Sequence, residues 1–207
     1  MATSHQRRTG AVIIPLKGFT KAKERLAPVF DAPKRSLLAQ MTATAVIDVT
    51  MKLPDVTRVV VVTDDESCAA WARSKGSEAL IETGGLNPSV AAAYRNIGNS
   101  VDWVMICHAD IVHPERLAAL PSPGESQAIL VRDRHRDGTN VLVLPAGEQF
   151  DFQYGPGSAE AHRQECEKRG IKPLEVIDNL LGIDMDTPED LKMLPEPLRQ
   201  RLGFPNN

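Results

Sequence analysis

The 207-residue sequence predicts a single α/β domain in which a mostly parallel, mixed sheet carries helices on both faces. Two observations carry this prediction. Short runs of β-branched residues, such as TRVVVVTDD (57–65), are typical of strands that are covered on both faces. Segments with helical spacing of apolar residues separate these runs, and this alternation favours right-handed βαβ crossovers. Because no repeat or long linker divides the chain, one domain is expected.

The first half of the chain alternates strands and helices. The expected strands are AVIIPL (11–16), TRVVVVTDD (57–65), SEALIE (77–82) and VDWVMICHAD (101–110). The expected helices occupy 33–51, 66–76 and the segment 84–99 after a glycine turn. Asp31 and Pro33 mark the start of the first helix, and Gly76 closes the second.

The second half changes character. Two apolar runs, 126–133 and 139–145, are expected to form a hairpin or a pair of neighbouring strands. A helix over 157–170, with Ser158 as its N-cap candidate, and a strand over 174–178 follow. Thr187 and Asp190 have capping-box spacing at the start of a last helix, 187–194. The domain is therefore expected to span 11–194, between a flexible tail (1–10) and a C-terminal tail (195–207).

Composition limits the function classes. Hydrophobic residues make up 42% and charged residues 25%, as in soluble globular proteins. The net charge of −3 and the 4% of aromatic residues argue against a nucleic-acid surface. The sequence shows no apolar run of about 18 residues and no signal-peptide pattern, so neither a membrane partner nor export is expected and the cytoplasm is the expected location. Three scattered cysteines support neither a disulfide framework nor a zinc site, and a homodimer is left open.

Cationic side chains follow the first expected strand. In open parallel sheets, ligands bind beyond the carboxyl ends of the strands. Lys17, Lys23 and Arg25 occupy such a position and could neutralise the charge of a triphosphate during attack at phosphorus. A solvated surface is the alternative for any short cationic run, and it is the interpretation that we favour for Lys21.

Two carboxylates from distant parts of the chain are candidate magnesium ligands. Asp110 ends the strand 101–110, and Asp184 lies in GIDMDTPEDL. Such a pair can hold Mg²⁺ against substrate phosphates. For Asp186, a metal ligand and a helix cap are both left open. The sequence contains no Ser-His-Asp order, HExxH or GxxxxGK[ST] motif, which argues against a hydrolase or a P-loop kinase.

Glycine-containing turns supply further candidates. TGGLNPSV (83–90) offers Gly85 for close backbone approach and Asn87 as an amide that could contact a base or ribose edge. RDGTN (136–140) and QYGPGSAEAH (153–162) offer candidates for a second phosphorylated ligand, which are Thr139, Gly155, Ser158 and His162. Ser158 is placed where free helix N–H groups bind anions. For His162, ligand contact and a half-exposed structural position are both left open.

Several segments together resemble one known family. PLKGFTKAKERLAP, VVVVTDD, GGLN, the strand ending in AD, DGTN, YGPGSAEAH and DMDTPEDL are collinear from about residue 11 to 194. In this order they resemble the 2-phospho-L-lactate guanylyltransferase family, whose phosphoenolpyruvate and 3-phospho-D-glycerate relatives also act in coenzyme F(420) biosynthesis. The resemblance implies a GT-A-like fold of the nucleotide-diphospho-sugar transferase type.

The resemblance also implies a reaction and a set of roles. The phosphate of a three-carbon acid would attack the α-phosphorus of GTP and release pyrophosphate, with Mg²⁺ as cofactor. The implied triphosphate ligands are Lys17, Lys23 and Arg25, and the implied nucleoside contacts are Asp64, Gly85 and Asn87. Magnesium would be held by Asp110 and Asp184. The acid would be bound by Thr139, Gly155 and Ser158. Positioning and charge neutralisation would carry the catalysis, because the attacking phosphate is already ionised.

The sequence departs from the family pattern beside the acceptor. Ile111, Val112 and His113 stand where the family has Leu-Pro after the strand-end aspartate, and RDGTN in place of GTGTN brings Arg136 and Asp137 to the acceptor loop. These extra polar groups are compatible with 3-phospho-D-glycerate, but 2-phospho-L-lactate and phosphoenolpyruvate remain open.

Two other functions are alternatives. The first is nucleotidyl transfer to another phosphorylated acceptor, such as a sugar phosphate or a molybdopterin, for which the segment 136–162 looks short. The second is a catalytically silent nucleotide-binding module. The presence of both Asp110 and Asp184 argues against the silent module, because binding alone does not need two metal carboxylates.

Overall fold

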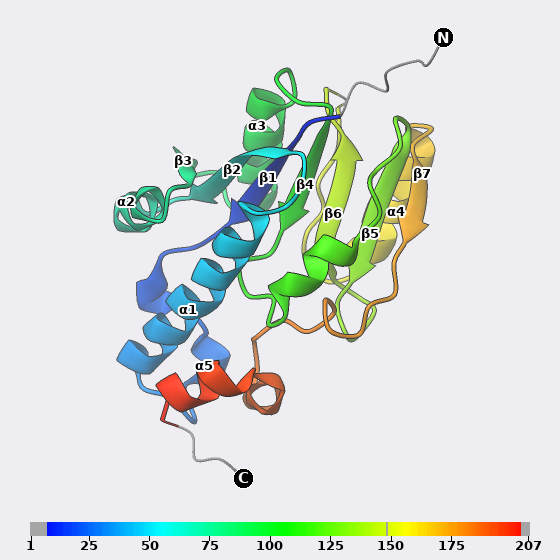
Figure 1. Cartoon of the computed structure of the whole chain (residues 1–207). Helices are drawn as coiled ribbons and strands as arrows, with labels where there is room; N and C mark the ends of the chain where they lie inside the picture. Colours follow the sequence, from blue (N-terminus) through cyan, green and yellow to red (C-terminus); the bar gives the residue numbers. More distant parts are fainter. Residues whose placement is uncertain (1–7, 148, 204–207) are drawn as a thin grey trace.

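A seven-stranded sheet forms the centre of the computed structural model, which describes residues 8–147 and 149–203 (Figure 1). From edge to edge the strands are β3 (Glu78–Ile81), β2 (Val56–Thr63), β1 (Gly10–Pro15), β4 (Trp103–Cys107), β6 (Thr139–Pro145), β5 (Gln127–Arg132) and β7 (Lys172–Glu175). β6 runs antiparallel to both of its neighbours, β4 and β5, while the other pairs are parallel. The predicted mixed, mostly parallel sheet is therefore confirmed.

Helices cover both faces of the sheet, as predicted (Figure 1). α1 (Ala32–Thr50) and α2 (Glu66–Ser74) pack on one face, and α3 (Leu86–Ile97) and α4 (Ser158–Lys168) pack on the other. Side chains of a strand alternate between its faces, so Val12 and Ile14 of β1 enter the first core while Ala11 and Ile13 enter the second. α1 begins as predicted, because the Asp31 carboxylate accepts the Lys34 N–H at 2.9 Å.

The C-terminal segment corrects two predictions. The last predicted helix is a 3₁₀ helix, η4 (Pro188–Met193), although its capping box between Thr187 and Asp190 is confirmed. The predicted C-terminal tail folds in part into α5 (Glu196–Arg201), and Leu202 is buried. Residues 1–7 and 204–207 of the two predicted tails lie outside the described residues. Within the described part of the chain, every helix is too short or too polar to cross a membrane.

A third apolar cluster connects α1 to the C-terminal segment. Its members come from the loop after β1, from α1 and from 183–202: Leu26, Phe30, Leu38, Met41, Val112, Ile183, Met185, Leu191, Leu194 and Leu202. The loop after β1 contains two short 3₁₀ turns, η1 (Phe19–Lys21) and η2 (Glu24–Leu26), and Leu26 of η2 enters the cluster. Another 3₁₀ helix, η3 (Pro114–Ala119), follows β4. None of these short turns was predicted from the sequence.

Candidate active site

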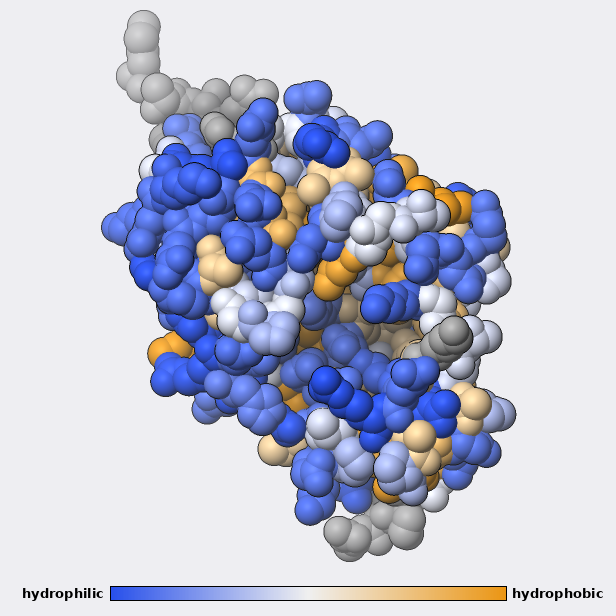
Figure 2. Space-filling view, turned by 180° about the vertical axis from the view of Figure 1, so that it is seen from behind, coloured by the Kyte–Doolittle hydropathy of each residue, from blue (hydrophilic) through white to orange (hydrophobic). Residues whose placement is uncertain are grey.

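A cavity of about 510 Å³ lies at the carboxyl ends of β1, β2 and β4. Figure 2 shows a hollow across the middle of one face of the molecule, above the part that carries the C-terminal end. The volume lies in the range of small-molecule sites, roughly 300–1,000 Å³. The cavity wall includes these residues selected from the sequence: Lys17, Lys23, Arg25, Asp64, Gly85, Asp110 and Asp186. The strand-end rule therefore selected the edge of the sheet at which this cavity lies.

Lys23 is the anchored cation of the cavity. Its ammonium lies 2.5 Å from Asp110 Oδ2, and its side chain is 10% exposed. Lys23 has a left-handed backbone (φ 54°), which is uncommon for a residue with a side chain and is enriched at active sites. Burial alone would raise the pKa of Asp110, but opposing effects, led by the positive charge of Lys23, outweigh burial and leave that pKa below its ordinary value. Lys17 and Arg25 are exposed at the rim.

Asp110 and Asp184 lie side by side. The Met185 N–H donates to the Asp110 carbonyl at 3.0 Å, and Ile111 pairs with Asp184 in an isolated bridge. Burial, followed by the charge of Asp110, raises the pKa of Asp184 to about 6. Two carboxylates that repel each other suit a divalent cation, and Mg²⁺ commonly takes one or two carboxylates together with substrate phosphates. The described residues contain no cluster of three or more acidic, His or Cys ligands, so substrate would have to supply the remaining ligands.

Strand-like alternation explains the positions of Asp184 and Asp186, which form a second acidic segment. Ile183 and Met185 are buried in the third cluster, so Asp184 and Asp186 point to the opposite side. Asp186 lines the cavity and its carboxylate pairs with Arg25, whereas Asp184 does not line the cavity. Thr187 is the cap of η4, so the helix-cap interpretation of Asp186 is wrong. A metal-binding role for Asp186 stays a prediction.

The nucleoside candidates separate in the structure. Asp64 lines the cavity, while its neighbour Asp65 caps α2. Gly85 is the N-cap of α3, and its φ of 83° explains the glycine. The Asn87 amide is used within the protein: Nδ2 donates to the Tyr154 carbonyl at 3.2 Å, and Oδ1 accepts the Tyr154 N–H at 2.7 Å. Asn87 therefore holds the 150–154 segment and does not line the cavity.

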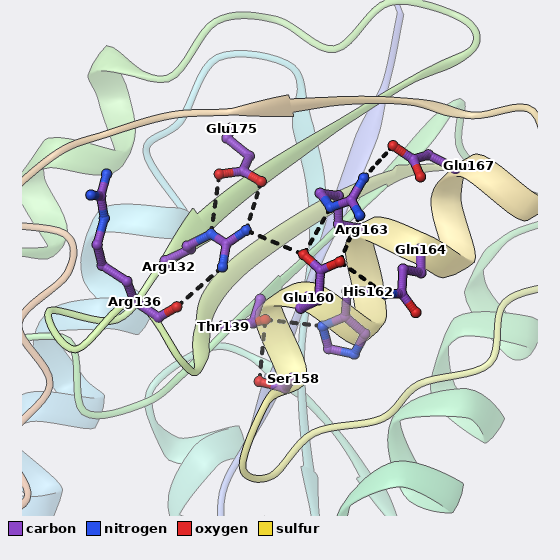
Figure 3. Close-up of polar contacts among 10 residues, drawn as sticks. All are labelled: Arg132, Arg136, Thr139, Ser158, Glu160, His162, Arg163, Gln164, Glu167 and Glu175. Atoms are coloured by element: carbon purple, nitrogen blue, oxygen red, sulfur yellow. Dashed lines mark hydrogen bonds and ion pairs between the residues drawn. The ribbon is translucent and has the colours of Figure 1, made fainter.

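Three of the four acceptor candidates, Thr139, Ser158 and His162, form a buried hydrogen-bonded group (Figure 3), whereas Gly155 is exposed. His162 Nδ1 lies 3.0 Å from Thr139 Oγ1, and Ser158 Oγ donates to the same oxygen at 3.3 Å. The Gln153 N–H donates to His162 Nε2 at 3.1 Å, so the ring proton of a neutral His162 is on Nδ1 and points at Thr139. Burial, with a smaller effect from His108, lowers the pKa of His162 to about 4 and keeps the ring neutral. The half-exposed interpretation of His162 is wrong, because its side chain is fully buried.

The helix N-terminus behind this group is already occupied. Gly157, and not Ser158, is the N-cap of α4. The Gly157 N–H donates to the Asp137 carboxylate at 3.0 Å, the Ala159 N–H donates to the Asp137 carbonyl, and the Ser158 N–H donates to Gly155. The expectation of free backbone N–H groups is therefore wrong, and the hydroxyl groups remain as donors. Thr139, Gly155, Ser158 and His162 do not line the cavity.

Charged side chains fix α4 to the edge of the sheet (Figure 3). Arg132 of β5 forms a bidentate pair with Glu175 of β7 and lies 3.8 Å from Glu160 of α4. Arg163 joins the same network through Glu160. Each exposed pair contributes little stability, but together they limit the movement of the helix that carries Ser158 and His162.

A family model decides the identity. The model described as "Guanylyl transferase CofC like" matches residues 10–195. The chain belongs to the CofC-like guanylyltransferase family. Phosphoenolpyruvate guanylyltransferase of Mycobacterium ulcerans is 31% identical over 189 residues, which cover 87% of this chain and 85% of that protein. The corresponding protein of Thermobaculum terrenum is 26% identical over 193 residues, covering 87% and 80%. This CofC-like chain is a nucleotidyltransferase, as the sequence predicted.

Solved structures share its fold. A proposed nucleotide-diphospho-sugar transferase of Desulfovibrio desulfuricans G20 superimposes with a TM-score of 0.68 at 17% identity, over 89% of this chain and 85% of that one. A 4-diphosphocytidyl-2C-methyl-D-erythritol synthase gives 0.63 at 13% identity, over 91% and 97%. At these identities the likeness shows the fold alone, and it confirms the predicted nucleotide-diphospho-sugar transferase type.

Several polar residues of the CofC-like cavity, among them Glu82 and His108, were missed from the sequence. Glu82 follows β3 and His108 follows β4, and both line the cavity. Each stands at the carboxyl end of a strand, so the rule that selected Asp64 and Asp110 could have selected them as well. A search by motif passes over His108 because it lacks the spacing of a metal ligand.

Proposed function

We propose that this chain transfers GMP from GTP to a three-carbon phospho-acid and releases pyrophosphate, in the biosynthesis of coenzyme F(420) and in the cytoplasm. Phosphoenolpyruvate is the first candidate acceptor, because the relatives compared above carry that name. 2-Phospho-L-lactate and 3-phospho-D-glycerate are the others. One observation carries the proposal: Lys17, Lys23 and Arg25 meet Asp110 on the wall of a single cavity.

The chemistry needs charge neutralisation more than proton transfer. An oxygen of the acceptor phosphate forms a new bond to the α-phosphorus of GTP, while the bond from that phosphorus to the bridging oxygen of pyrophosphate breaks. Lys23 is held by Asp110 where a phosphate would enter, and Lys17 and Arg25 can turn inward from the rim. Fixed cations that face the developing charge lower the barrier without reorganisation of the site.

The proposed magnesium site lies at the edge of the cavity, where Asp110 of the cavity wall is beside Asp184. Asp110 and Asp184 would hold the Mg²⁺, with Asp186 as a further candidate, because the first two carboxylates are adjacent and partly buried. The cation would neutralise phosphate charge and orient the triphosphate. The part of the cavity wall away from these carboxylates includes Asp64, Glu82 and Gly85, which are the proposed nucleoside contacts.

Product analysis tests the proposal. The protein is incubated with GTP, Mg²⁺ and the three acids in competition, and the products are identified by mass spectrometry. We expect pyrophosphate and one guanylyl diphospho-acid, formed only when an acid is present. If folded protein releases no pyrophosphate with any of the three acids, the proposal fails, and a panel of sugar phosphates and pterins then tests the alternative acceptors.

The Thr139–His162 contact predicts a difference between two variants. Asparagine at 162 places an amide N–H close to the position of Nδ1, whereas glutamine reaches the position of Nε2. His162→Gln therefore removes the donor to Thr139, and we expect the KM for the acid to rise by about tenfold, the value of one neutral hydrogen bond. His162→Asn should change this KM by less than about threefold. Steady-state kinetics with the acid as the varied substrate measure both values.

These two variants control for each other. Each loses one hydrogen bond and part of the ring volume, so similar decreases in Tm are expected. The KM for GTP should not change in either variant, because His162 is outside the cavity wall. Equal acid KM values in the two variants would show that the contact with Thr139 has no kinetic role.

A further inference from the structure

Two buried polar atoms have no protein partner. Within the described part of the chain, His108 Nε2 and the Tyr154 hydroxyl are both buried without a hydrogen bond. Buried polar side chains are nearly always paired, so an orphaned pair in one region calls for an explanation, such as a ligand. His108 lines the cavity, and Tyr154 is 9% exposed.

The two side chains connect the cavity to the acceptor group. The rings of His108 and Tyr154 lie 5.2 Å apart between centroids, and Tyr154 meets His162 edge-on at 4.7 Å. The backbone N–H of His108 donates to the Asn140 carbonyl at 3.1 Å, which places the end of β4 beside the residue that follows Thr139. A ligand that reaches inward from Asp110 towards Thr139 would therefore pass both orphaned atoms.

The position of Tyr154 is fixed from its backbone. Asn87 accepts the Tyr154 N–H and donates to its carbonyl, so a side chain of α3 clamps this one residue of the 150–154 segment from both sides. Such a clamp explains why Asn87 is absent from the cavity wall. It also keeps the Tyr154 hydroxyl in the protein interior although that hydroxyl contributes no hydrogen bond of its own to the fold.

Both groups can donate a hydrogen bond to a ligand. Burial raises the pKa of Tyr154 well above its ordinary value, so its phenol keeps the proton. A phenol O–H and an imidazole N–H donate to anionic oxygens, and charge-assisted bonds of this kind are the stronger ones. Asp110, Asp133 and Lys23 are the charges that act on His108, and Lys23 offers partial compensation for an incoming anion.

We propose that the Tyr154 hydroxyl and His108 Nε2 bind the carboxylate of the acceptor acid, the end that does not react. This inference rests on the proposed function. The reacting phosphate must face the triphosphate near Lys23 and Asp110, so the carboxylate is directed inward, past His108. Tyr154 and His108 thereby select acids over simple phosphate esters.

Tyr154→Phe is a selective test, because it removes one oxygen that has no partner in the free protein. We expect the KM for the acid to rise about tenfold or more, the KM for GTP to stay the same, and Tm to be unchanged or higher. His108→Phe should raise the acid KM in the same selective way. Tyr94→Phe is the matched control, since Tyr94 is the other of the two tyrosines and its hydroxyl donates to the Pro145 carbonyl. That variant should lower Tm and leave both KM values unchanged.

The outcomes separate the two proposals. If wild-type protein turns over none of the acids, the proposed function fails and the carboxylate site fails with it. If wild-type protein is active and Tyr154→Phe has an unchanged acid KM, the carboxylate site is overturned while the proposed function stands. With an active wild type, a selective rise in acid KM at unchanged Tm supports the site.

Discussion

Asp110→Asn is expected to abolish guanylyl transfer while the protein stays folded. Asparagine has the same shape but removes the charge that holds Lys23 at 2.5 Å and one of the two adjacent carboxylates proposed for Mg²⁺. Where a preorganised charge contact stabilises a transition state, its loss lowers kcat by about a thousandfold. Pyrophosphate release under saturating GTP and acid measures kcat, and circular dichroism checks the fold.

Two controls accompany this variant. Asp102→Asn makes the same substitution just before the start of β4, where the carboxylate accepts the Thr9 N–H, and should leave kcat unchanged. In metal-free Asp110→Asn protein, the pKa of Asp184 should fall from about 6, because the neighbouring negative charge that raises it is gone. NMR titration of the Asp184 carboxyl measures that pKa. Near-normal turnover in Asp110→Asn would remove Asp110 from the reaction.

Sequence patterns predicted the sheet well because its central strands are buried on both faces. In β2, for example, Val59–Val62 are all buried, and a continuous β-branched run of that kind has few other solutions. The rule that ligands bind at strand ends then correctly selected Lys17, Asp64 and Asp110 as residues of the cavity wall. These residues lie at the ends of strands, and the apolar pattern of the sequence shows where each strand ends.

Side-chain partnerships were harder to predict. Asn87 looks like a ligand amide in sequence, but it binds the backbone of Tyr154, a residue 67 positions away. Ser158 looks like a helix cap, but Asp137 from another loop occupies the N–H groups at that helix end. Such choices depend on tertiary contacts between distant segments, and local pattern carries no information about them. The same holds for α5, which is attached through the partly buried Leu198 and the following Leu202 to the third apolar cluster.

Asp190→Ala is expected to have the largest effect on stability. Asp190 is 1% exposed and pairs with Arg134 through one carboxylate oxygen. Its other oxygen accepts the N–H groups of Asp186 at 3.0 Å and Thr187 at 2.6 Å and the Thr187 hydroxyl at 2.9 Å. Removing one member of a buried ion pair costs about 3–5 kcal/mol, since the remaining charge and donors lose their partner. For a chain of this length that corresponds to a decrease in Tm of roughly 10 °C.

The location of Asp190 makes this loss functional as well as structural. The N–H groups that donate to Asp190 belong to the segment that carries Asp184 and Asp186. The Asp190 carboxylate therefore holds this acidic segment against η4. Asp31→Ala is a suitable reference, because Asp31 caps α1 at an exposed position and its loss should cost only about 1 kcal/mol. Thermal unfolding of both variants, with and without Mg²⁺ and GTP, compares them. If the Tm of Asp190→Ala is no lower than that of Asp31→Ala, Asp190 does not hold the acidic segment in place. The apolar cluster around Met185 must then position Asp184 by itself.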